Sequence, residues 1–484
     1  MLDTETDVET QPQPQKPAAR GAIDRARELM GYVASLDAAS SLAQRQDLLN
    51  KLTPRADTAL GDLAGIYRDA PQPMEARERE ALAVARALAL ALARAYKSAA
   101  MQSKGKVALP IFNAMTYIAD AMRGSYYTYS KVPDGTWREM NELFQLAQQK
   151  GLATTVARAE SGMSIGDYYG ECLLLSLTDP YRLARGELAA IVALLRARKL
   201  PISLGKEAPD TRATAHFIAG DADTPPRPLR DVDANSLPAT AYIFDTTGLV
   251  DRLRAGLEGE PAESRALVAK LVGLWENPPK RVFQRDPAQG SVAICIGVKP
   301  IAHFVAHEAE VDGEAEHEAL RKGITMPLKA LPEDESGVAI PIHEWALINL
   351  SAGGARVRRT SSTNYPVTVG EVAGIRAPGK VLWTIGVTRW VTGLDDGTLE
   401  FGVQFFANAV CAVWVKEAVS RGRKLGLLVA EGEDNAEESL LTPPGTYAEL
   451  ADFELRGEGF VSRVRAARLV ERNSRFDLFR VVAV

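Results

Sequence analysis

Two short motifs in the second half of the chain carry side chains suited to holding an anionic ligand. They are Arg281-Val-Phe-Gln-Arg285 and Asn349-Leu-Ser351-Ala-Gly-Gly354. The planar guanidinium fork of arginine can pair bidentately with phosphate oxygens or with guanine O6 and N7, and it can stack on a base. Two arginines spaced by four residues could therefore clamp a compact anionic nucleotide from one side.

The N-x-S-x-x-G motif offers complementary groups for the other side of such a ligand. The Asn349 amide can meet a base edge, the Ser351 hydroxyl can stabilise a turn, and Gly354 lets the backbone turn tightly or approach a ligand closely. Taken singly, the arginines could be surface cations and the second motif a strand-ending turn. A second RxxxR pair, Arg468 and Arg472, has no such motif after it. The order of the motifs therefore carries the inference.

Composition indicates a multidomain globular protein without a broad basic surface. A chain of 484 residues is too long to fold around a single hydrophobic core. Its composition, with 46% apolar and 25% charged residues, is ordinary for a globular protein. A net charge of −5 argues against duplex nucleic acid or an anionic membrane as the main partner. Cys172, Cys295 and Cys411 lie far apart in apolar runs, which indicates free thiols. We expect a cytoplasmic protein with no membrane span.

The first 200 residues predict a tail followed by an all-α helical bundle. Residues 1–20 are Gln/Pro-rich and acidic, which is typical of a disordered tail, and residues 21–200 carry helical patterns almost throughout. The segment from Ala81 to Ala100 is Ala/Leu-rich without Gly or Pro, as in a buried helix. A capping box, Thr136-x-x-Glu139, predicts the start of another helix.

Residues 201–277 predict a linker with a small α/β segment. The first part of this stretch is rich in proline, aspartate and glycine. A strand over Ala239–Phe244 and helices over Val250–Leu257 and Ser264–Trp275 follow. Pro278-Pro279 then form a stiff hinge directly before the arginine pair.

From residue 278 onward the pattern changes to strands. The β-branched and aromatic runs are Ser291 to Val298, Trp345 to Asn349, Val381 to Val391 and Leu399 to Phe406. Closely spaced antiparallel strands of this kind predict a small barrel over residues 278–420, followed by a β-rich extension over residues 421–484. The whole chain is therefore expected to be a multidomain α+β protein.

An acidic insertion separates the two motifs. Acidic residues stand at every second position from Glu308 to Glu318, a pattern typical of a solvated loop or edge. Counting along the chain, 63 residues lie between Arg285 and Asn349. Like charge close to the site could weaken the binding of a dianion.

The motifs and the strands after them resemble the PilZ domain, a bacterial family that binds the second messenger cyclic di-GMP. The resemblance covers residues 278 to about 416, under a third of the chain. It includes the strand segments VGEVAGIR, WTIGVTRWV and LEFGVQFF. The helical half, including Thr178 to Leu183, is also similar to large proteobacterial proteins with a C-terminal PilZ-like domain.

The resemblance implies a six-stranded antiparallel β-barrel with a flexible arginine arm that folds over the ligand. It implies that Arg281 and Arg285 contact guanine and phosphate. It also implies that Asn349, Ser351 and Gly354 hold a second face of cyclic di-GMP. No catalytic residue follows from it.

Two other constellations could carry chemistry. Phe244-Asp245-Thr246-Thr247-Gly248 is similar to phosphorylated aspartate loops, but it lacks the second acid, and a helix N-cap is the alternative. His303 and His307 are four apart and are followed by His317 among carboxylates. The region reads as a strand leading into a loop, where that spacing does not align two ligands. We expect neither a metal nor a cofactor.

The leading hypothesis is a non-enzymatic receptor for cyclic di-GMP, in which ligand binding changes the arrangement of domains and a helical module engages an unidentified protein partner. One alternative is an interaction scaffold with a degenerate barrel that binds no ligand. A second alternative is a phosphoryl-transfer enzyme that uses Asp245.

Overall fold

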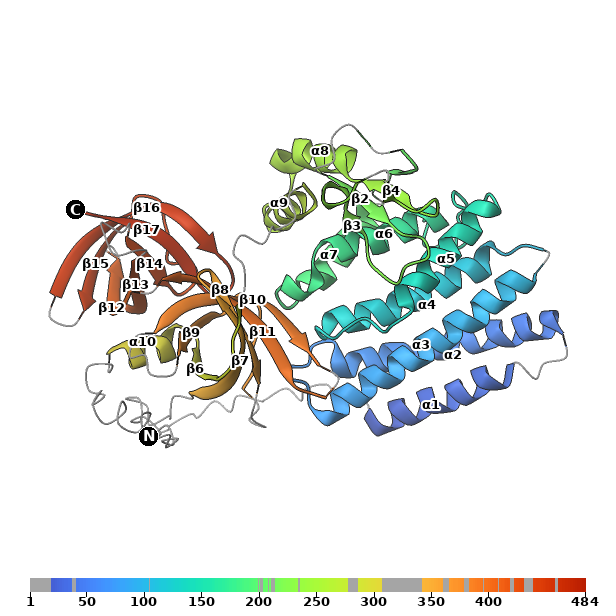
Figure 1. The fold of residues 1–484 in the computed structure, drawn as a ribbon, viewed down its shortest axis with the longest axis horizontal. Coiled ribbons are helices and arrows are strands. Elements are labelled where there is room, and N and C mark those ends of the chain that lie inside the picture. The colour runs from blue at the N-terminus through green and yellow to red at the C-terminus, as the bar shows by residue number, and fades with distance from the viewer. Residues whose placement is uncertain are drawn as a thin grey trace, which may run out of the picture.

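The structure is a computed structural model that describes most of the chain. The described residues are 19–36, 41–103, 105–198, 200, 203–207, 209, 214–233, 236–276, 286–306, 342–359, 365–377, 383–394, 396–407, 409–417, 422–430, 438–457 and 460–484. The arginine pair, the hinge prolines, the acidic insertion and nearly all of the predicted tail lie outside them. Figure 1 shows the helical half of the chain on one side and the strands of the C-terminal half on the other.

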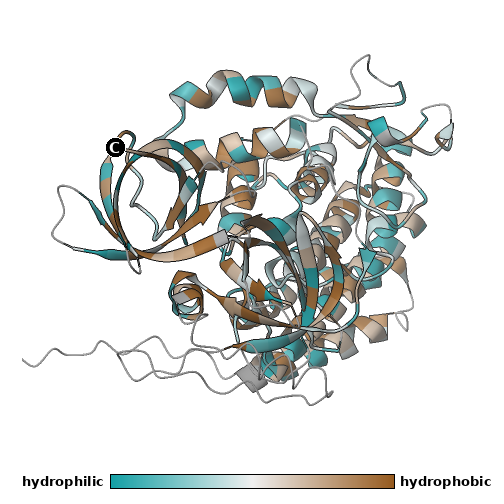
Figure 2. Ribbon diagram, turned by 60° about the vertical axis from the view of Figure 1, so that its left-hand side comes forward, coloured by the Kyte–Doolittle hydropathy of each residue, from teal (hydrophilic) through white to brown (hydrophobic). Residues whose placement is uncertain are grey.

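Seven α-helices of the described N-terminal part pack into a bundle. They are α1 (Ala19–Ser35), α2 (Leu42–Tyr67), α3 (Ala76–Gln102), α4 (Ala108–Tyr127), α5 (Thr136–Gln149), α6 (Ile165–Leu177) and α7 (Glu187–Arg198). Leu88 and Leu92 on α3 and Ile111 on α4 are fully buried. Figure 2 shows hydrophobic residues on these helices beside hydrophilic ones. Burial of the apolar faces stabilises the bundle and confirms the predicted all-α region.

The start of α5 differs from its predicted form. The residue before the helix is Gly135, at φ +86°, and Thr136 is already helical. The Thr136 hydroxyl donates a hydrogen bond to the Pro133 carbonyl over 2.5 Å. The predicted capping box with Glu139 is therefore wrong, because the hydroxyl is one residue too far along the chain to accept from the first turn.

A carboxylate from a distant loop caps α5 instead. Asp223 accepts hydrogen bonds from the backbone N–H groups of Gly135, Trp137 and Arg138 at 2.5, 3.0 and 3.2 Å. The first turn of a helix leaves N–H groups unpaired and carries partial positive charge, so an anion there is favourable. The loop that follows strand β2 (Ala215–Ile218) is thereby fixed to the bundle.

We expect Asp223→Ala to lower the free energy of unfolding by about 1 to 2 kcal/mol, because three backbone donors lose their acceptor. Urea denaturation followed by circular dichroism measures the change. Asp221→Ala is the matched control, since Asp221 accepts only a long hydrogen bond of 3.5 Å, from the Thr240 hydroxyl, among the described residues. Equal losses in both variants would contradict the capping role.

The predicted linker packs as a small α/β unit of the helical half. Its strands pair in the order β1-β4-β2-β3. Their bounds and those of the helices are β1 (Ser203–Gly205), β2 (Ala215–Ile218), β3 (Arg227–Pro228), β4 (Tyr242–Asp245), α8 (Thr247–Gly256) and α9 (Ala262–Glu276). Phe244, Val250 and Trp275 are buried in the same apolar core as the seven helices. This part of 201–277 is therefore packed against the bundle.

The first β-domain is a closed six-stranded antiparallel barrel, as predicted. Its strands are β6 (Ser291–Ile296), β7 (His343–Ser351), β8 (Gly354–Arg359), β9 (Val372–Arg376), β10 (Thr384–Gly393) and β11 (Leu399–Ala407). They follow the order β7-β6-β9-β10-β11-β8, and β8 pairs back with β7. A short strand, β5 (Asp286–Pro287), adds to the edge of β7. Trp345, Val357 and Phe401 fill the interior.

The C-terminal residues form a second closed barrel. Its strands are β12 (Ala409–Glu417), β13 (Lys424–Ala430), β14 (Glu438–Thr442), β15 (Asp452–Gly457), β16 (Phe460–Arg472) and β17 (Asp477–Ala483). Because β12 pairs with β13 and β15, it belongs to this barrel, and the predicted boundary at 420 falls after its first strand. The sequence shows a run of strands but not which of them pair.

The first barrel docks on the helical half through the tip of its β10–β11 hairpin. The Gly393 N–H donates to the Tyr129 carbonyl over 3.0 Å, and the Val367 N–H donates to the Gln72 carbonyl over 3.0 Å. The Tyr129 ring is 5% exposed and packs into the core of the barrel, while its hydroxyl donates to the Leu183 carbonyl. The helical half and the barrel therefore share a buried contact.

The two barrels are joined by polar and apolar contacts. Arg389 on β10 makes two bonds of 2.7 Å to Glu471 on β16, and the Asn473 amide donates to the Gly370 carbonyl over 3.1 Å. Helix α10 (Val298–Ala306) packs against both barrels and buries Phe304. A movement of one barrel relative to the other would expose this core.

Candidate functional site

The N-x-S-x-x-G motif forms the β7–β8 hairpin of the first barrel. Asn349 lies near the end of β7 opposite Arg356, and Ser351 lies opposite Gly354. The Ser351 hydroxyl donates to the Gly354 carbonyl over 3.1 Å, which ties the two ends of the turn together. The structure thus brings these three predicted residues into one tight corner.

Gly354 stands where no larger residue fits. A Cβ atom at this position would lie 2.3 Å from the Val403 carbonyl oxygen of β11, far inside van der Waals contact. Gly354 pairs with Gln404 on the same strand. Absence of a side chain therefore permits β8 and β11 to meet at this end of the barrel.

The short strand β5 lies directly beside the Asn349 end of β7. Asp286 pairs with Leu350 and Pro287 pairs with Asn349, and the Ala288 N–H donates to the Ile348 carbonyl over 3.2 Å. Arg281 and Arg285 lie outside the described residues, but Arg285 is bonded to Asp286. Asp286, the residue directly after the arginine pair, is therefore next to the β7–β8 hairpin.

Asn349 carries a buried polar atom that no described residue pairs with. Its side-chain oxygen Oδ1 is buried and has no hydrogen-bond partner among the described residues. A buried acceptor without a partner costs about 1 to 3 kcal/mol relative to a paired one. Such an atom, on the residue that pairs with Pro287 of β5, is suited to accept a hydrogen bond from a ligand or an ordered water.

Strand β8 adds charged residues that the sequence analysis did not single out. Glu400 on β11 is 1% exposed and pairs with both Arg356 and Arg358. The Cζ atom of the Arg356 guanidinium also lies 5.8 Å from the centre of the Trp390 ring. The alternating Arg-Val-Arg segment is the only signal in the sequence, since the pairing acid lies more than 40 residues away.

Asp245 stabilises the start of α8 in the structure, one residue before the N-cap Thr246. Its Oδ1 accepts from the Thr247 backbone N–H at 2.9 Å and from the Thr247 hydroxyl at 2.6 Å, directly before α8. The helix-cap alternative accounts for this carboxylate. The second RxxxR pair is also structural in part, since Arg472 pairs with the buried Asp477 over 2.8 Å.

The histidine region is helical rather than a strand. His303 lies on α10, which begins after Gly297 at φ +100° and carries Pro300 in its first turn, where proline is tolerated. His307 and His317 lie outside the described residues. Within the described ranges, no group of three His, Cys, Asp or Glu side chains is arranged to hold a metal ion.

Two further observations bear on the setting of the protein. The three cysteines are free, and Cys172 and Cys295 are buried. Among the residues that the structure describes, no helix combines the length and the apolar character needed to cross a membrane.

Two regions of the chain match family models. Residues 17–205 match the model described as "Cyclic-di-GMP receptor FimW, N-terminal domain", and residues 310–410 match "Cyclic-di-GMP receptor FimW, middle PilZ domain". The chain therefore contains a PilZ domain within a larger protein that has a helical N-terminal region, which confirms the resemblance found in the motifs. The PilZ match includes Asn349, Ser351 and Gly354 and begins after the arginine pair.

A curated relative agrees with these matches. The chain is 25% identical over 343 residues to the cyclic-di-GMP receptor FimW of Pseudomonas aeruginosa. The similarity covers 58% of this chain and 56% of that protein. The chain thus matches just over half the length of this relative.

Proposed function

We propose that this protein is a receptor for cyclic di-GMP and not an enzyme. The ligand lies between the β7–β8 hairpin and the arginine segment that enters β5. Arg281 and Arg285 contact guanine and phosphate, and Asn349, Ser351 and Gly354 hold the opposite face. The protein binds its ligand without a cofactor or a metal. The free cysteines suit a reducing compartment, the cytoplasm.

The observation that carries the proposal is the pairing of β5 with β7. It sets the residue bonded to Arg285 opposite Leu350, one position from Asn349. Asp286, the residue that follows the arginine motif, therefore lies beside the second motif, although 63 residues separate Arg285 from Asn349 along the chain. The acidic insertion lies between α10 and β7 along the chain, and β5 pairs with β7 in spite of it. The relative from Pseudomonas aeruginosa, named as a cyclic-di-GMP receptor, gives independent support.

Titration of the full chain with cyclic di-GMP in a calorimeter tests the ligand. We expect saturable binding with a dissociation constant in the low micromolar range or below. Cyclic di-AMP is the control nucleotide, because adenine presents a donor where guanine presents the O6 acceptor. Absence of binding, or equal binding of both nucleotides, would contradict the proposal. Absence would favour the alternative of an interaction scaffold with a degenerate barrel.

Asn349→Ala should weaken cyclic di-GMP binding about tenfold without lowering the melting temperature, because the removed Oδ1 has no hydrogen-bond partner among the residues that the structure describes. Calorimetry and thermal unfolding measure the two quantities. Asn473→Ala is the matched control: Asn473 donates to Gly370 and accepts from Arg475 and Phe476. We expect it to lower stability and to leave affinity unchanged. The same response in both variants would remove Asn349 from the site.

Ligand binding is proposed to change how the domains are arranged and thereby how the helical half engages a protein partner. Gly354 packs on β11, and the other end of β11 belongs to the hairpin that docks at Tyr129. This strand is a direct mechanical link between the two places. Small-angle scattering with and without cyclic di-GMP measures the change, and superposable profiles at saturation would argue against it.

A further inference from the structure

A cavity of about 390 Å³ lies within the helical bundle, outside both barrels. Its walls come from α2, α3, α4, α7 and the segment after α5. Five arginines line it: Arg68, Arg86, Arg123, Arg158 and Arg196. The volume falls within the range of about 300 to 1,000 Å³ that is usual for small-molecule sites.

The cavity holds more positive than negative charge. Asp57 and Asp120 line it, and the buried Glu171 lies behind it. Arg123 pairs with Asp120 over 2.5 Å and with Glu171 over 3.6 Å, and Arg196 reaches Glu171 over 3.3 Å. Five guanidinium groups thus meet three carboxylates, which leaves two positive charges in excess. A partly enclosed site screens such charge less than open solvent does.

Two of the arginines have partners that leave their charge uncompensated. The Nε and Nη2 atoms of Arg158 donate to the neutral Asn113 amide oxygen at 3.0 and 2.7 Å. The Cζ atom of Arg68 lies 5.2 Å from the centre of the Tyr127 ring. Within the described residues, neither guanidinium forms an ion pair with a carboxylate. Both can therefore accept an anionic ligand without giving up an existing ion pair.

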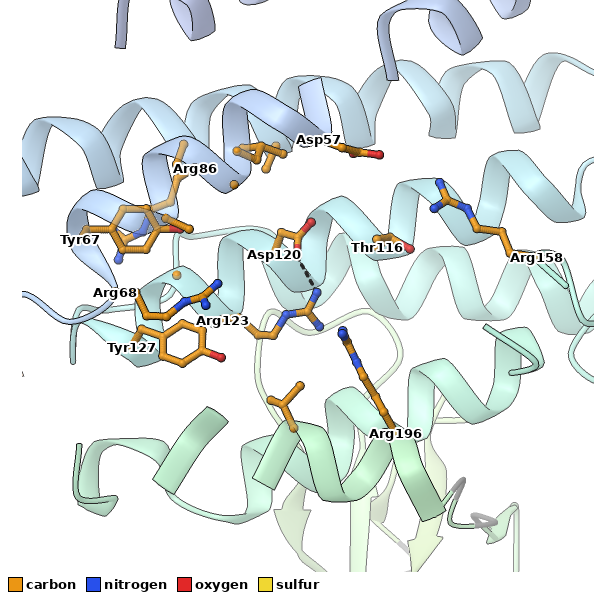
Figure 3. A pocket seen from close by; sticks show the side chains of 17 residues that line it. Asp57, Tyr67, Arg68, Arg86, Thr116, Asp120, Arg123, Tyr127, Arg158 and Arg196 are labelled. Carbon is orange, nitrogen blue, oxygen red and sulfur yellow. Dashed lines mark hydrogen bonds and ion pairs between the residues drawn. The ribbon is translucent and has the colours of Figure 1, made fainter. Parts of the chain in front are cut away.

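Figure 3 shows how these groups are distributed. Arg158 lies at one end of the cavity, Arg68 and Arg86 lie at the other, and Arg123 and Arg196 lie between them. Arg123 is 8% exposed and forms the floor. The charges therefore follow the length of the cavity and do not form a single point.

Tyrosine hydroxyls complete the polar lining. Burial, with the nearby Asp120 carboxylate, raises the pKa of Tyr67 to about 12, so its hydroxyl remains protonated at neutral pH. Tyr127 stands on the opposite side of Arg68. Neutral hydroxyl donors beside guanidinium forks are a usual setting for phosphoryl oxygens.

We propose that this cavity binds a phosphorylated small molecule carrying about two negative charges, at a site separate from the barrel. Bidentate arginine forks match phosphoryl oxygens in geometry as well as in charge. The buried floor fixes one part of the ligand, and the exposed rim at Arg68 and Arg196 admits it from solvent.

Calorimetry of the full chain with inorganic pyrophosphate at constant ionic strength tests the site. We expect one binding event, weakened about tenfold or more by Arg158→Gln and by Arg68→Gln, since each loses a charged hydrogen-bond donor. The Arg68 guanidinium lies on the exposed rim and stacks near the Tyr127 ring, so Arg68→Gln should fold even if Arg158→Gln does not. Arg138→Gln, an exposed arginine on α5, is the control and should bind as the unmodified chain does.

Three outcomes would overturn the proposal. The first is no binding of pyrophosphate at millimolar concentration. The second is unchanged affinity in both arginine variants, or a loss that occurs in Asn349→Ala instead, which would place the anion in the barrel. The third is equal binding of succinate at the same ionic strength, which would make the site one for dicarboxylates. Binding of cyclic di-GMP is measured separately, so failure of this site leaves the receptor proposal standing.

Discussion

Replacing both Arg281 and Arg285 by alanine is expected to weaken cyclic di-GMP binding by at least a hundredfold. A hydrogen bond to a charged group contributes roughly 1.5 to 3 kcal/mol, and the double variant removes two such side chains. The combined loss of about 3 to 6 kcal/mol corresponds to roughly two to four orders of magnitude in affinity. Calorimetric titration of the full chain measures it.

The matched control for this prediction removes the same charge from the second barrel. Arg463 and Arg468 are exposed on β16, away from the β7–β8 hairpin. Their double alanine variant should bind cyclic di-GMP as the unmodified chain does, apart from a small general effect of charge that rising salt reduces. If both double variants lose affinity equally, the arginine segment has no specific role.

Gly354→Val is expected to lower the stability of the first barrel by about 3 kcal/mol or more, whether or not a ligand is present. The added Cβ would lie 2.3 Å from the Val403 carbonyl oxygen, and that atom belongs to a paired strand. Overpacking of a well-packed site costs about 1 to 3 kcal/mol. A collision with a backbone atom costs more, because no change of rotamer relieves it. Thermal unfolding followed by tryptophan fluorescence measures the loss, and Trp345 in the core of this barrel contributes to that signal.

Gly31→Ala serves as the control for this glycine substitution. Gly31 lies within α1, and a Cβ there meets nothing within 4 Å. Alanine in a helix is favoured over glycine by roughly 0.5 to 1 kcal/mol, so the control should be neutral or stabilising. A normal melting temperature in Gly354→Val would show that the glycine serves ligand approach alone and not the closure of the barrel.

Much of the secondary structure, and the local form of one half of the candidate site, could be read from the sequence. Strands over Trp345–Asn349 and Leu399–Phe406 lie within β7 and β11, and the helix predicted from Ala81 to Ala100 lies within α3. The hairpin at Ser351 was recognisable as a turn because its residues are local neighbours. Hydrophobic patterns of period two or 3.6 and turn residues depend on a few adjacent positions, so they can be recognised from the sequence alone.

The remaining features depend on pairs that are distant in the sequence. Asp223 caps a helix that begins near Gly135, whereas local reasoning had assigned the cap to Thr136. Glu400 holds the arginines of β8, and the arginine cavity draws on helices from α2 to α7. No hydrophobic periodicity in the sequence predicts such contacts, because each contact forms only when separate elements pack together.

The sequence by itself determined the order of the two motifs, the PilZ resemblance and the division into a helical and a β-rich half. Only the tertiary structure decided that β5 lies beside β7, that Asn349 keeps an unpaired buried oxygen, and that β12 begins a second barrel. The reason is physical. The side-chain pattern of an element determines which of its faces is buried. Several strands have similar patterns, however, so only the packing of the whole chain determines which of them pair.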